Sequence, residues 1–263
     1  MSDPLVLYQV DATSAIVTLN REDKRNALCR ELITEMADVL TRAENDDSVR
    51  SVILTGKGKA FCAGMDLAEV QESVLGGGDD SPVWDDALRL ANLYDQIYRC
   101  PKPTIAAVRG AAVAGGAGLV SVCDLALATP DAKLGYPEVR RGLVAAMVMP
   151  HLLRHVGERM ARYLLLTGEL IDGEEAARCG LVNAVASEGD LMTQAKGWAR
   201  SLAEGGPQAL TKTKELLAQF SQQASSIEEA AKASAAPRLS EECKLGLEAF
   251  FARKPVPWAP KDS

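Results

Sequence analysis

Apolar residues along the first half of the chain follow two different periods, which predicts strands interleaved with helices. Leu5–Val10 and Ala15–Leu19 alternate between apolar and polar positions, and this pattern is typical of a β-hairpin. From Ala27 to Ala43 the apolar residues recur at helical spacing with polar residues between them. That segment is predicted to form an amphipathic helix with one buried face.

Three short apolar runs further along the chain predict buried strands, at Ser51–Thr55, Thr104–Val108 and Leu125–Thr129. A stretch of helical periodicity, Trp84–Arg99, lies between the first two of them. Strands that alternate with helices usually pair in parallel, so the pattern predicts an α/β protein.

After Met149 the pattern becomes helical to the end of the chain, interrupted by one short predicted strand at Leu181–Val185. The predicted helices are Pro150–Val156, Glu158–Leu166, Gly173–Arg178, Leu191–Leu202, Pro207–Phe220 and Leu239–Phe251. We therefore divide the chain into a core over residues 1–190 and a helical C-terminal region over residues 191–263. Val74–Pro82 holds three glycines, two acids and a proline, which predicts a mobile loop.

The composition is that of a globular protein and narrows the choice of partners. The 263 residues are 47% hydrophobic and 25% charged, which excludes a disordered tail, a collagen-like fibre and a coiled-coil rod. The formal net charge is −7 and no dense block of Lys or Arg occurs, so we expect no nucleic-acid partner. Backbone N–H groups and a small local cluster of cations still suffice to bind one phosphate-bearing ligand.

The six cysteines are scattered and form no Cys-x-x-Cys pair, which predicts reduced and mostly buried thiols. No basic segment precedes an apolar stretch at the N-terminus, and the longest run of small and apolar residues is short and rich in glycine. We expect a cytoplasmic protein without a membrane partner.

Two segments rich in Gly and Ala each follow a predicted strand: residues 59–67 and residues 111–119. In a parallel sheet the backbone N–H groups of two such loops can converge on one oxygen atom, which is the geometry of an oxyanion hole. Close packing of a helix against a strand would also account for the glycines. A dinucleotide-binding fingerprint is a third interpretation, but Ser121 stands where its last glycine is required.

Pro137 and Glu138 lie in the segment Tyr136–Gly142, which follows the predicted strand at Leu125–Thr129. The pair suits the first turn of a helix, and Glu138 is alternatively a general acid/base at the mouth of the site. His151 and His155 share a helix face, but no third ligand accompanies them, so we expect no metal.

Together these segments resemble the enoyl-CoA hydratase/isomerase (crotonase) superfamily along nearly the whole chain. The motifs that carry the resemblance stand in the family's order: Arg25–Leu28, Phe61–Leu67, Lys102–Gly110, Gly115-Gly116 with Cys123-Asp124, Tyr136–Glu138, Leu166–Gly168, Ala176–Val182, and Phe250-Phe251 with Lys254-Pro255. Each motif is weak singly, and the ordered set is specific.

The resemblance implies an α/β fold, a crotonase-like spiral of ββα units, whose helical C-terminal region builds a homo-trimer or a dimer of trimers. It implies an acyl-CoA substrate and no separate cofactor, since CoA is part of the substrate. Glu138 would be the catalytic residue, and the N–H groups of Met65 and Gly115 would form the oxyanion hole. The residues that would bind CoA are Lys24, Arg25, Ala27, Ala63, Asp66 and Leu67.

The sequence departs from the straight-chain hydratases of this family at the first of their two glutamates, where Gly118 stands here. Ser121, one helical turn later, is a candidate for orienting water in its place. Residues 142–149 are also bulkier than the family's usual glycine-rich turn, which implies a different acyl pocket.

The resemblance favours an enoyl-CoA hydratase, with methylglutaconyl-CoA or another branched thioester as one candidate substrate. Because one carboxylate suffices to carry a proton between two carbons, a double-bond isomerase is the main alternative. A dinucleotide-binding oxidoreductase and a non-catalytic RNA-binding scaffold are more distant alternatives.

Overall fold

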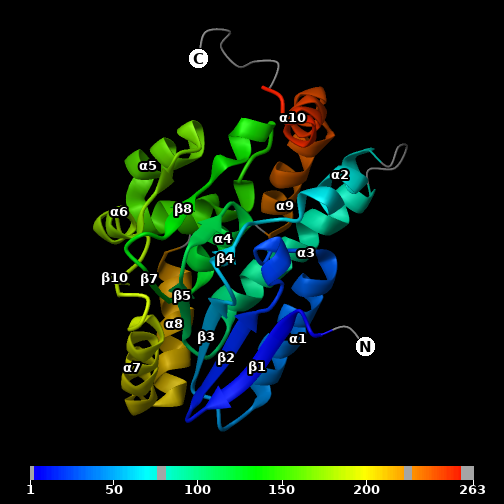
Figure 1. Cartoon of the computed structure of the whole chain (residues 1–263). Helices are drawn as coiled ribbons and strands as arrows, with labels where there is room; N and C mark the ends of the chain where they lie inside the picture. Colours follow the sequence, from blue (N-terminus) through cyan, green and yellow to red (C-terminus); the bar gives the residue numbers. More distant parts are fainter. Residues whose placement is uncertain (1–2, 76–80, 222–226, 256–263) are drawn as a thin grey trace.

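Two sheets form the framework of the protein in the computed structural model, which describes residues 3–75, 81–221 and 227–255 (Figure 1). The larger sheet has the strand order β1-β2-β3-β5-β7-β10, and the smaller one has the order β4-β6-β8-β9. The large sheet contains β1 (Val6–Asp11), β2 (Ser14–Leu19), β3 (Ser51–Gly56), β5 (Thr104–Val108), β7 (Leu125–Ala128) and β10 (Ala184–Val185). The small sheet contains β4 (Ala60–Cys62), β6 (Ala111–Val113), β8 (Lys133–Gly135) and β9 (Leu170–Ile171).

The chain passes from the large sheet to the small sheet and then into a helix three times. β3 and β4 lead to α2 (Leu67–Leu75) and α3 (Ser81–Arg99), and β5 and β6 lead to α4 (Gly115–Val122). β7 and β8 lead to the 3-10 helix η2 (Pro137–Arg141), then to η3 (Ala146–Val148) and α5 (Met149–Thr167). The strands that begin these repeats pair in parallel, as do the strands that follow them. This repetition is the spiral of ββα units that the resemblance implies.

Helices cover both faces of the large sheet because its central strands are apolar on both sides. The face with Ile53 and Ile105 packs against α7 (Leu191–Glu204) through Leu191 and Ala195. On the opposite face, α1 (Arg30–Asn45) contributes to the main core with a row of fully buried residues that includes Leu32 and Met36. Figure 1 shows α7 and α1 on opposite sides of the strands.

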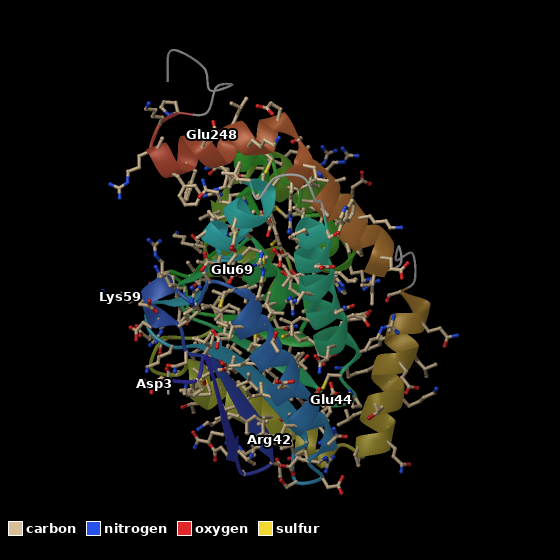
Figure 2. All side chains as sticks on the ribbon, turned by 90° about the vertical axis from the view of Figure 1, so that its right-hand side faces the viewer. Asp3, Arg42, Glu44, Lys59, Glu69 and Glu248 are labelled. Carbon is tan, nitrogen blue, oxygen red and sulfur yellow. The ribbon has the colours of Figure 1, made fainter. Side chains whose placement is uncertain are left out.

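The C-terminal helices run along the core and then across the end that carries the small sheet. They are α8 (Pro207–Phe220), α9 (Ile227–Ala235), η4 (Ala236–Leu239) and α10 (Glu241–Ala252), after the short α6 (Gly173–Arg178). α9 packs on α3 through Ala231 and Ala235, and α10 packs on α2 through Leu247 and Val70. Figure 2 shows α10, where Glu248 is labelled, lying above α2, where Glu69 is labelled.

Most predicted elements are confirmed, and the differences have local causes. The hairpin, the three buried strands and their parallel pairing are present, five of the six thiols are buried, and the described residues form no disulfide. α1 begins at Arg30 instead of Ala27, because Arg25 and Asn26 adopt positive φ and Leu28 pairs with Met65. The break predicted between two helices at Gly157 is confirmed, because Gly157 has non-helical backbone angles (φ 68°, ψ 168°) and two helical segments of α5 meet there in a kink.

The loop prediction for Val74–Pro82 is wrong at both ends of that segment. Val74 and Leu75 belong to α2, Ser81 and Pro82 belong to α3, and residues 76–80 lie outside the described residues. Within the described ranges, no helix is both long enough and apolar enough to cross a membrane.

Candidate active site

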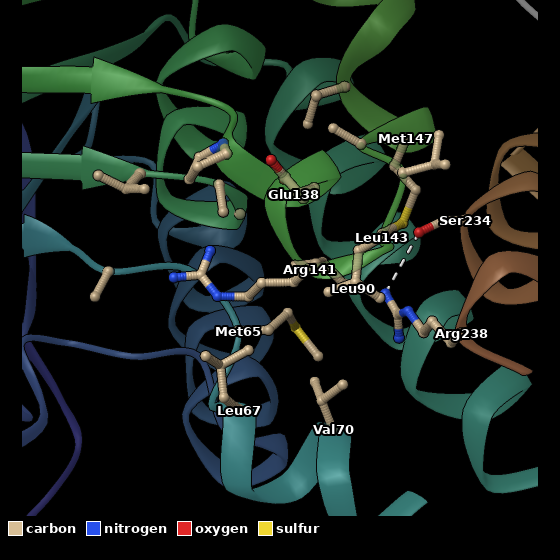
Figure 3. A pocket seen from close by; sticks show the side chains of 18 of the residues that line it. Met65, Leu67, Val70, Leu90, Glu138, Arg141, Leu143, Met147, Ser234 and Arg238 are labelled. Carbon is tan, nitrogen blue, oxygen red and sulfur yellow. Dashed lines mark hydrogen bonds between the residues drawn. The ribbon is translucent and has the colours of Figure 1, made fainter. Parts of the chain in front are cut away.

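A cavity of about 110 Å³ lies where α3, the end of β4, the start of α4, η2 and η4 meet (Figure 3). Most of its lining is apolar, with Leu90, Leu143, Met147 and Val148 among the larger side chains. Its ionisable side chains are those of Tyr94, Glu138, Arg141 and Arg238, and Glu138 is the single carboxylate in the lining that the structure describes. A small apolar cavity with a few polar groups is the usual form of a small-molecule site.

The two glycine-rich segments meet at one side of this cavity. Gly64 has a φ of 91°, and a Cβ atom built on it would lie 2.9 Å from the Ala114 Cβ and 3.2 Å from the Gly115 nitrogen. Only a glycine lets the two segments approach this closely. As a result Met65, which follows Gly64, and Gly115, which opens α4, line the same cavity.

The backbone turn before α4 is strained. Ala114 has a φ of 52° and a ψ of −122°, although it carries a side chain, and it caps α4 without a side-chain hydrogen bond. Such a conformation costs on the order of 1–3 kcal/mol, and it tends to persist where it positions functional groups. Here the strained turn places the N–H of Gly115 at the start of a helix, where it has no partner within that helix.

Glu138 is held by a short 3-10 helix whose position is fixed from within the core. Tyr136 is fully buried, and its hydroxyl lies 2.6 Å from the Ser121 Oγ of α4. Pro137 starts η2 and Gly142 ends it with a positive φ, so Glu138 occupies the first turn and lines the cavity. Its Oε2 is buried and accepts no hydrogen bond within the described part of the chain. Burial raises the pKa of Glu138 to about 7.

The position of the absent family glutamate is filled by Tyr94 of α3. A side chain at Gly118 would collide with the Tyr94 hydroxyl and would lie 2.7 Å from the Val148 Cγ1. The Tyr94 hydroxyl donates a 2.7 Å hydrogen bond to the carbonyl of Gly115. Burial raises the pKa of Tyr94 well above its usual value, so the phenol remains a proton donor at neutral pH.

Ser121 does not take part in the site, which corrects the prediction that it could orient a water molecule. Its side chain is 1% exposed, and its hydroxyl donates to the Ala117 carbonyl and pairs with the Tyr136 hydroxyl. Ser121 is not among the described residues that line the cavity. Every residue of α4 is buried, so the sequence of this helix does not show which of its sides faces the site.

The predicted CoA-binding residues fall into two adjoining segments. The Ala63 N–H donates to the Arg25 carbonyl at 3.0 Å, and the Leu28 N–H donates to the Gly64 carbonyl at 2.8 Å. Ala63 and Leu67 line the cavity, whereas Lys24 and Arg25 are exposed beside it.

Asp66 and Ala27, the other two predicted CoA-binding residues, do not line the cavity. Asp66 forms an ion pair with Arg21 at 2.7 Å, and Arg21 also donates to the Ala27 carbonyl. Binding of CoA by all six residues remains a prediction.

Three ionisable residues in the described lining of the cavity were not singled out from the sequence. Arg141 belongs to the Tyr136–Gly142 segment, and its place at the end of that motif was the available signal. Tyr94 and Arg238 gave no signal, because they lie on helices far from the glycine-rich motifs in the sequence and reach the cavity only through packing.

The combined geometry is that of a site for chemistry beside a carbonyl group. Two backbone segments converge where an oxyanion could form, and a buried carboxyl group with a pKa near neutrality faces the same space. The described residues contain no group of three or more His, Cys, Asp or Glu side chains arranged to hold a metal ion. The glycines at positions 116 and 118 are required by close contact with Cys62 and Tyr94, which accounts for them without a dinucleotide.

Comparison with known proteins agrees with this class of site. The model of the enoyl-CoA hydratase/isomerase family matches residues 9–261. A Thermus thermophilus protein with the provisional name enoyl-CoA hydratase is 42% identical over 245 residues, which covers 92% of this chain and 95% of that protein. The short-chain-enoyl-CoA hydratase of Clostridium acetobutylicum is 35% identical over 215 residues, covering 81% and 80% of the two chains.

A solved structure is similar along its whole length. The enoyl-CoA hydratase/isomerase from Xanthobacter autotrophicus Py2 superposes with a TM-score of 0.86 at 30% identity, covering 97% of this chain and 99% of the other. The fold is therefore crotonase-like. The chain belongs to the enoyl-CoA hydratase/isomerase family and is an enzyme of that family.

Proposed function

We propose that the protein is an enoyl-CoA hydratase, which adds water reversibly across the double bond of a short 2-enoyl-CoA. The observation that carries the proposal is the Glu138 carboxyl group, buried and unpartnered at Oε2, in one small cavity with Met65 and Gly115. The names of the Thermus and Clostridium relatives support hydration.

In the proposed mechanism the thioester carbonyl accepts hydrogen bonds from the N–H groups of Met65 and Gly115. Glu138 in its ionised form takes a proton from a water molecule while the water oxygen bonds to C3. The electron pair of the double bond moves onto the thioester as an enolate, whose negative charge the two N–H groups stabilise. Glu138 then returns the proton to C2, so that one water is added and the carboxylate is regenerated.

A pKa near 7 suits a single group that must both accept and donate a proton. At neutral pH both forms of Glu138 are populated, and neither proton transfer is strongly uphill. A carboxyl group with the ordinary value of 4.5 would accept a proton from water less readily.

A double-bond isomerase is the second candidate, because the described lining of the cavity holds one carboxylate and Gly118 is not a glutamate. In that reaction Glu138 would move a proton between C2 and C4 without adding water. The mass of the product separates the two reactions, because hydration adds one water and isomerisation adds nothing.

The test is to incubate wild type and Glu138→Gln with crotonyl-CoA and with a 3-enoyl-CoA, and to measure rates and product masses. We expect wild type to add water to crotonyl-CoA and the variant to lose at least about 100-fold in kcat. Glu158→Gln, an exposed glutamate paired with Arg162, is the matched control. Unchanged turnover in Glu138→Gln would reject the assigned role, and isomerisation without hydration would favour the second candidate.

The assembly that the family resemblance implies, a homo-trimer or a dimer of trimers, is part of the proposal. Large apolar side chains on the surface support it, since Leu166 is 70% exposed and Leu217 is 63% exposed. Light scattering of the purified protein would measure the assembly directly.

A further inference from the structure

A buried arginine lines the cavity without an acidic partner. Arg238 of η4 is 7% exposed, and its Nη2 donates one long hydrogen bond of 3.4 Å to the Ser234 Oγ. Among the described residues, no carboxylate lies within ion-pairing distance of its guanidinium. A buried charge normally has such a partner, because removal of an unpaired ion from water is costly.

The acid that acts most strongly on the charge of Arg238, Asp86 of α3, already has other partners. Arg30 donates to both of its carboxylate oxygens, at 2.7 Å and 2.9 Å, and the Ser73 hydroxyl donates to it at 2.6 Å. Asp86 therefore stabilises the positive charge of Arg238 electrostatically, while its own oxygens accept hydrogen bonds from Arg30 and Ser73. Burial lowers the pKa of Arg238, because its guanidinium is removed from water.

The cavity as a whole has an excess of positive charge. Arg141 also lines it, and its guanidinium lies 4.8 Å above the Phe250 ring. Its Nε is buried and has no hydrogen-bond partner among the described residues. Glu138 is the one described acid in the lining, and near neutral pH it is only partly ionised. The walls thus carry two cations against less than one anion.

The two arginines lie at different ends of the cavity. Figure 3 shows the Arg238 guanidinium beside Ser234, on the side opposite the Arg141 guanidinium, with Met65 and Leu143 between them. The end that holds Arg238 is formed by α3, η3 and α9, where Leu90 and Met147 complete the wall. Met65 and Leu67 belong to the segment expected to meet CoA, so Arg238 lies at the end left for the acyl group.

We infer that the acyl group of the substrate carries a carboxylate, which binds to Arg238 and Ser234. The substrate is then a monothioester of a short unsaturated dicarboxylic acid, for which glutaconyl-CoA serves as the probe. This inference rests on the proposed acyl-CoA function of the site. It goes beyond that function by stating that the acyl group is negatively charged. A planar guanidinium suits a carboxylate because it can donate two parallel hydrogen bonds.

The reaction itself is unchanged, because the distal carboxylate takes no part in bond making. Water adds across the double bond as before, and the Arg238 contact fixes the far end of the acyl chain. A site built to bind a charged group discriminates strongly against an analogue that lacks it, since the buried cation is then left unpaired.

The first test measures binding, so that it does not depend on which reaction the enzyme catalyses. Glutaryl-CoA and butyryl-CoA are saturated thioesters that differ by the distal carboxylate and cannot be hydrated. By calorimetry we expect wild type to bind glutaryl-CoA about 100-fold more tightly than butyryl-CoA. Equal binding of the two, or binding of neither, would overturn the inference.

The second test compares catalysis on glutaconyl-CoA and crotonyl-CoA in wild type, Arg238→Met and Arg238→Lys. We expect Arg238→Met to lower the ratio of kcat/KM on glutaconyl-CoA to kcat/KM on crotonyl-CoA by about 100-fold. Arg238→Lys should recover part of the preference, because it restores the charge without the planar pair of donors. Equal losses on both thioesters would show a merely structural role.

The matched control is Arg154→Met, because Arg154 also has a buried guanidinium nitrogen without a hydrogen-bond partner in the described part of the chain, but lies outside the cavity. Its preference between the two thioesters should equal that of wild type. Thermal unfolding of each variant reports whether the fold is intact. If glutaryl-CoA binds preferentially but glutaconyl-CoA gains no water, the hydratase proposal fails while the inference about charge stands.

Discussion

The hydroxyl of Tyr94 occupies the space beside the Cα of Gly118, where a side chain would collide with it. The same hydroxyl donates to the carbonyl of Gly115, at the start of the helix that carries both glycines. The absence of a carboxylate at position 118 and the presence of tyrosine at position 94 are therefore linked by packing. A glutamate at position 118 would require a smaller residue at position 94.

Tyr94→Phe should lower kcat by about tenfold and leave KM nearly unchanged. The substitution removes the hydrogen bond that holds the Gly115 peptide, and that peptide is proposed to stabilise the enolate rather than to bind the substrate tightly. Steady-state kinetics on the best thioester substrate separate the two parameters. A rise in KM with an unchanged kcat would show that Tyr94 contacts the substrate instead.

The packing of Gly118 against Tyr94 predicts an energetic coupling between the two positions. Gly118→Ala should destabilise the protein by about 1–3 kcal/mol, because the added methyl group would press on Tyr94 and lie 2.7 Å from Val148. In a Tyr94→Leu background the same substitution should cost at least about 0.5 kcal/mol less. Urea unfolding of the four proteins measures this coupling, and additive costs would contradict the packing argument.

The pH dependence of kcat/KM should report the carboxyl group of Glu138. The rate should rise with pH and level off, with a midpoint near 7, because the ionised form accepts the proton from water. Arg141 lowers the pKa of Glu138 by its charge, so Arg141→Met should move the midpoint to higher pH. A midpoint near 4.5, the ordinary value for glutamate, would show that another group controls the rate.

The elements that frame the site were predicted from the sequence because their signals are local. The apolar runs of β3, β5 and β7 are continuous, and α6 begins at Gly173 after Asp172, whose side chain accepts a hydrogen bond from the Glu175 N–H. The small sheet was missed because three of its strands have only three residues and the fourth has two, which is too short to show a period.

The parts of the candidate site that the sequence predicted are those formed by backbone turns and by residues that are adjacent in the sequence. Glycine at position 64 and the Pro-Glu pair at 137–138 mark positions where the chain must turn, and both lead into the cavity. Tyr94 and Arg238 could not be predicted, because each comes from a distant helix whose packing brings it to the lining. Ser121 was wrongly predicted to face the site, since the orientation of a helix buried on all sides leaves no pattern in its sequence.

Gly64→Ala should disrupt the contact that brings Met65 beside Gly115. An alanine there would adopt a φ of 91° and press against Ala114 and the Val113 carbonyl, both at 2.9 Å. We expect kcat to fall by about 100-fold, as it does when one oxyanion donor is displaced. Gly157→Ala is the matched control, because Gly157 also has positive φ but a Cβ there would meet nothing within 4 Å. That control should lose about 1–3 kcal/mol of stability, because its backbone conformation (φ 68°, ψ 168°) strains an alanine, and it should keep its activity.

Glu138→Gln should make the protein more stable than wild type at pH 8. The pKa of Glu138 is about 7 in the folded protein and 4.5 ordinarily, so between these values the folded state binds more protons than the unfolded state. The contribution of Glu138 to the free energy of unfolding is therefore fully present below pH 4.5 and is lost as the pH rises toward 7. The difference of about 2.5 pKa units corresponds to at most roughly 3 kcal/mol.

The neutral glutamine removes this penalty, and part of the gain is offset because its amide group also lacks a partner in the cavity. Urea unfolding at several pH values should show Glu138→Gln ahead of wild type at pH 8, with the gap closing toward pH 5. Glu158→Gln should show no such gap, because Glu158 is exposed. A gap that widened on acidification would mean that Glu138 is stabilised as an anion in the folded protein, and its proposed role as a proton carrier at neutral pH would fail with it.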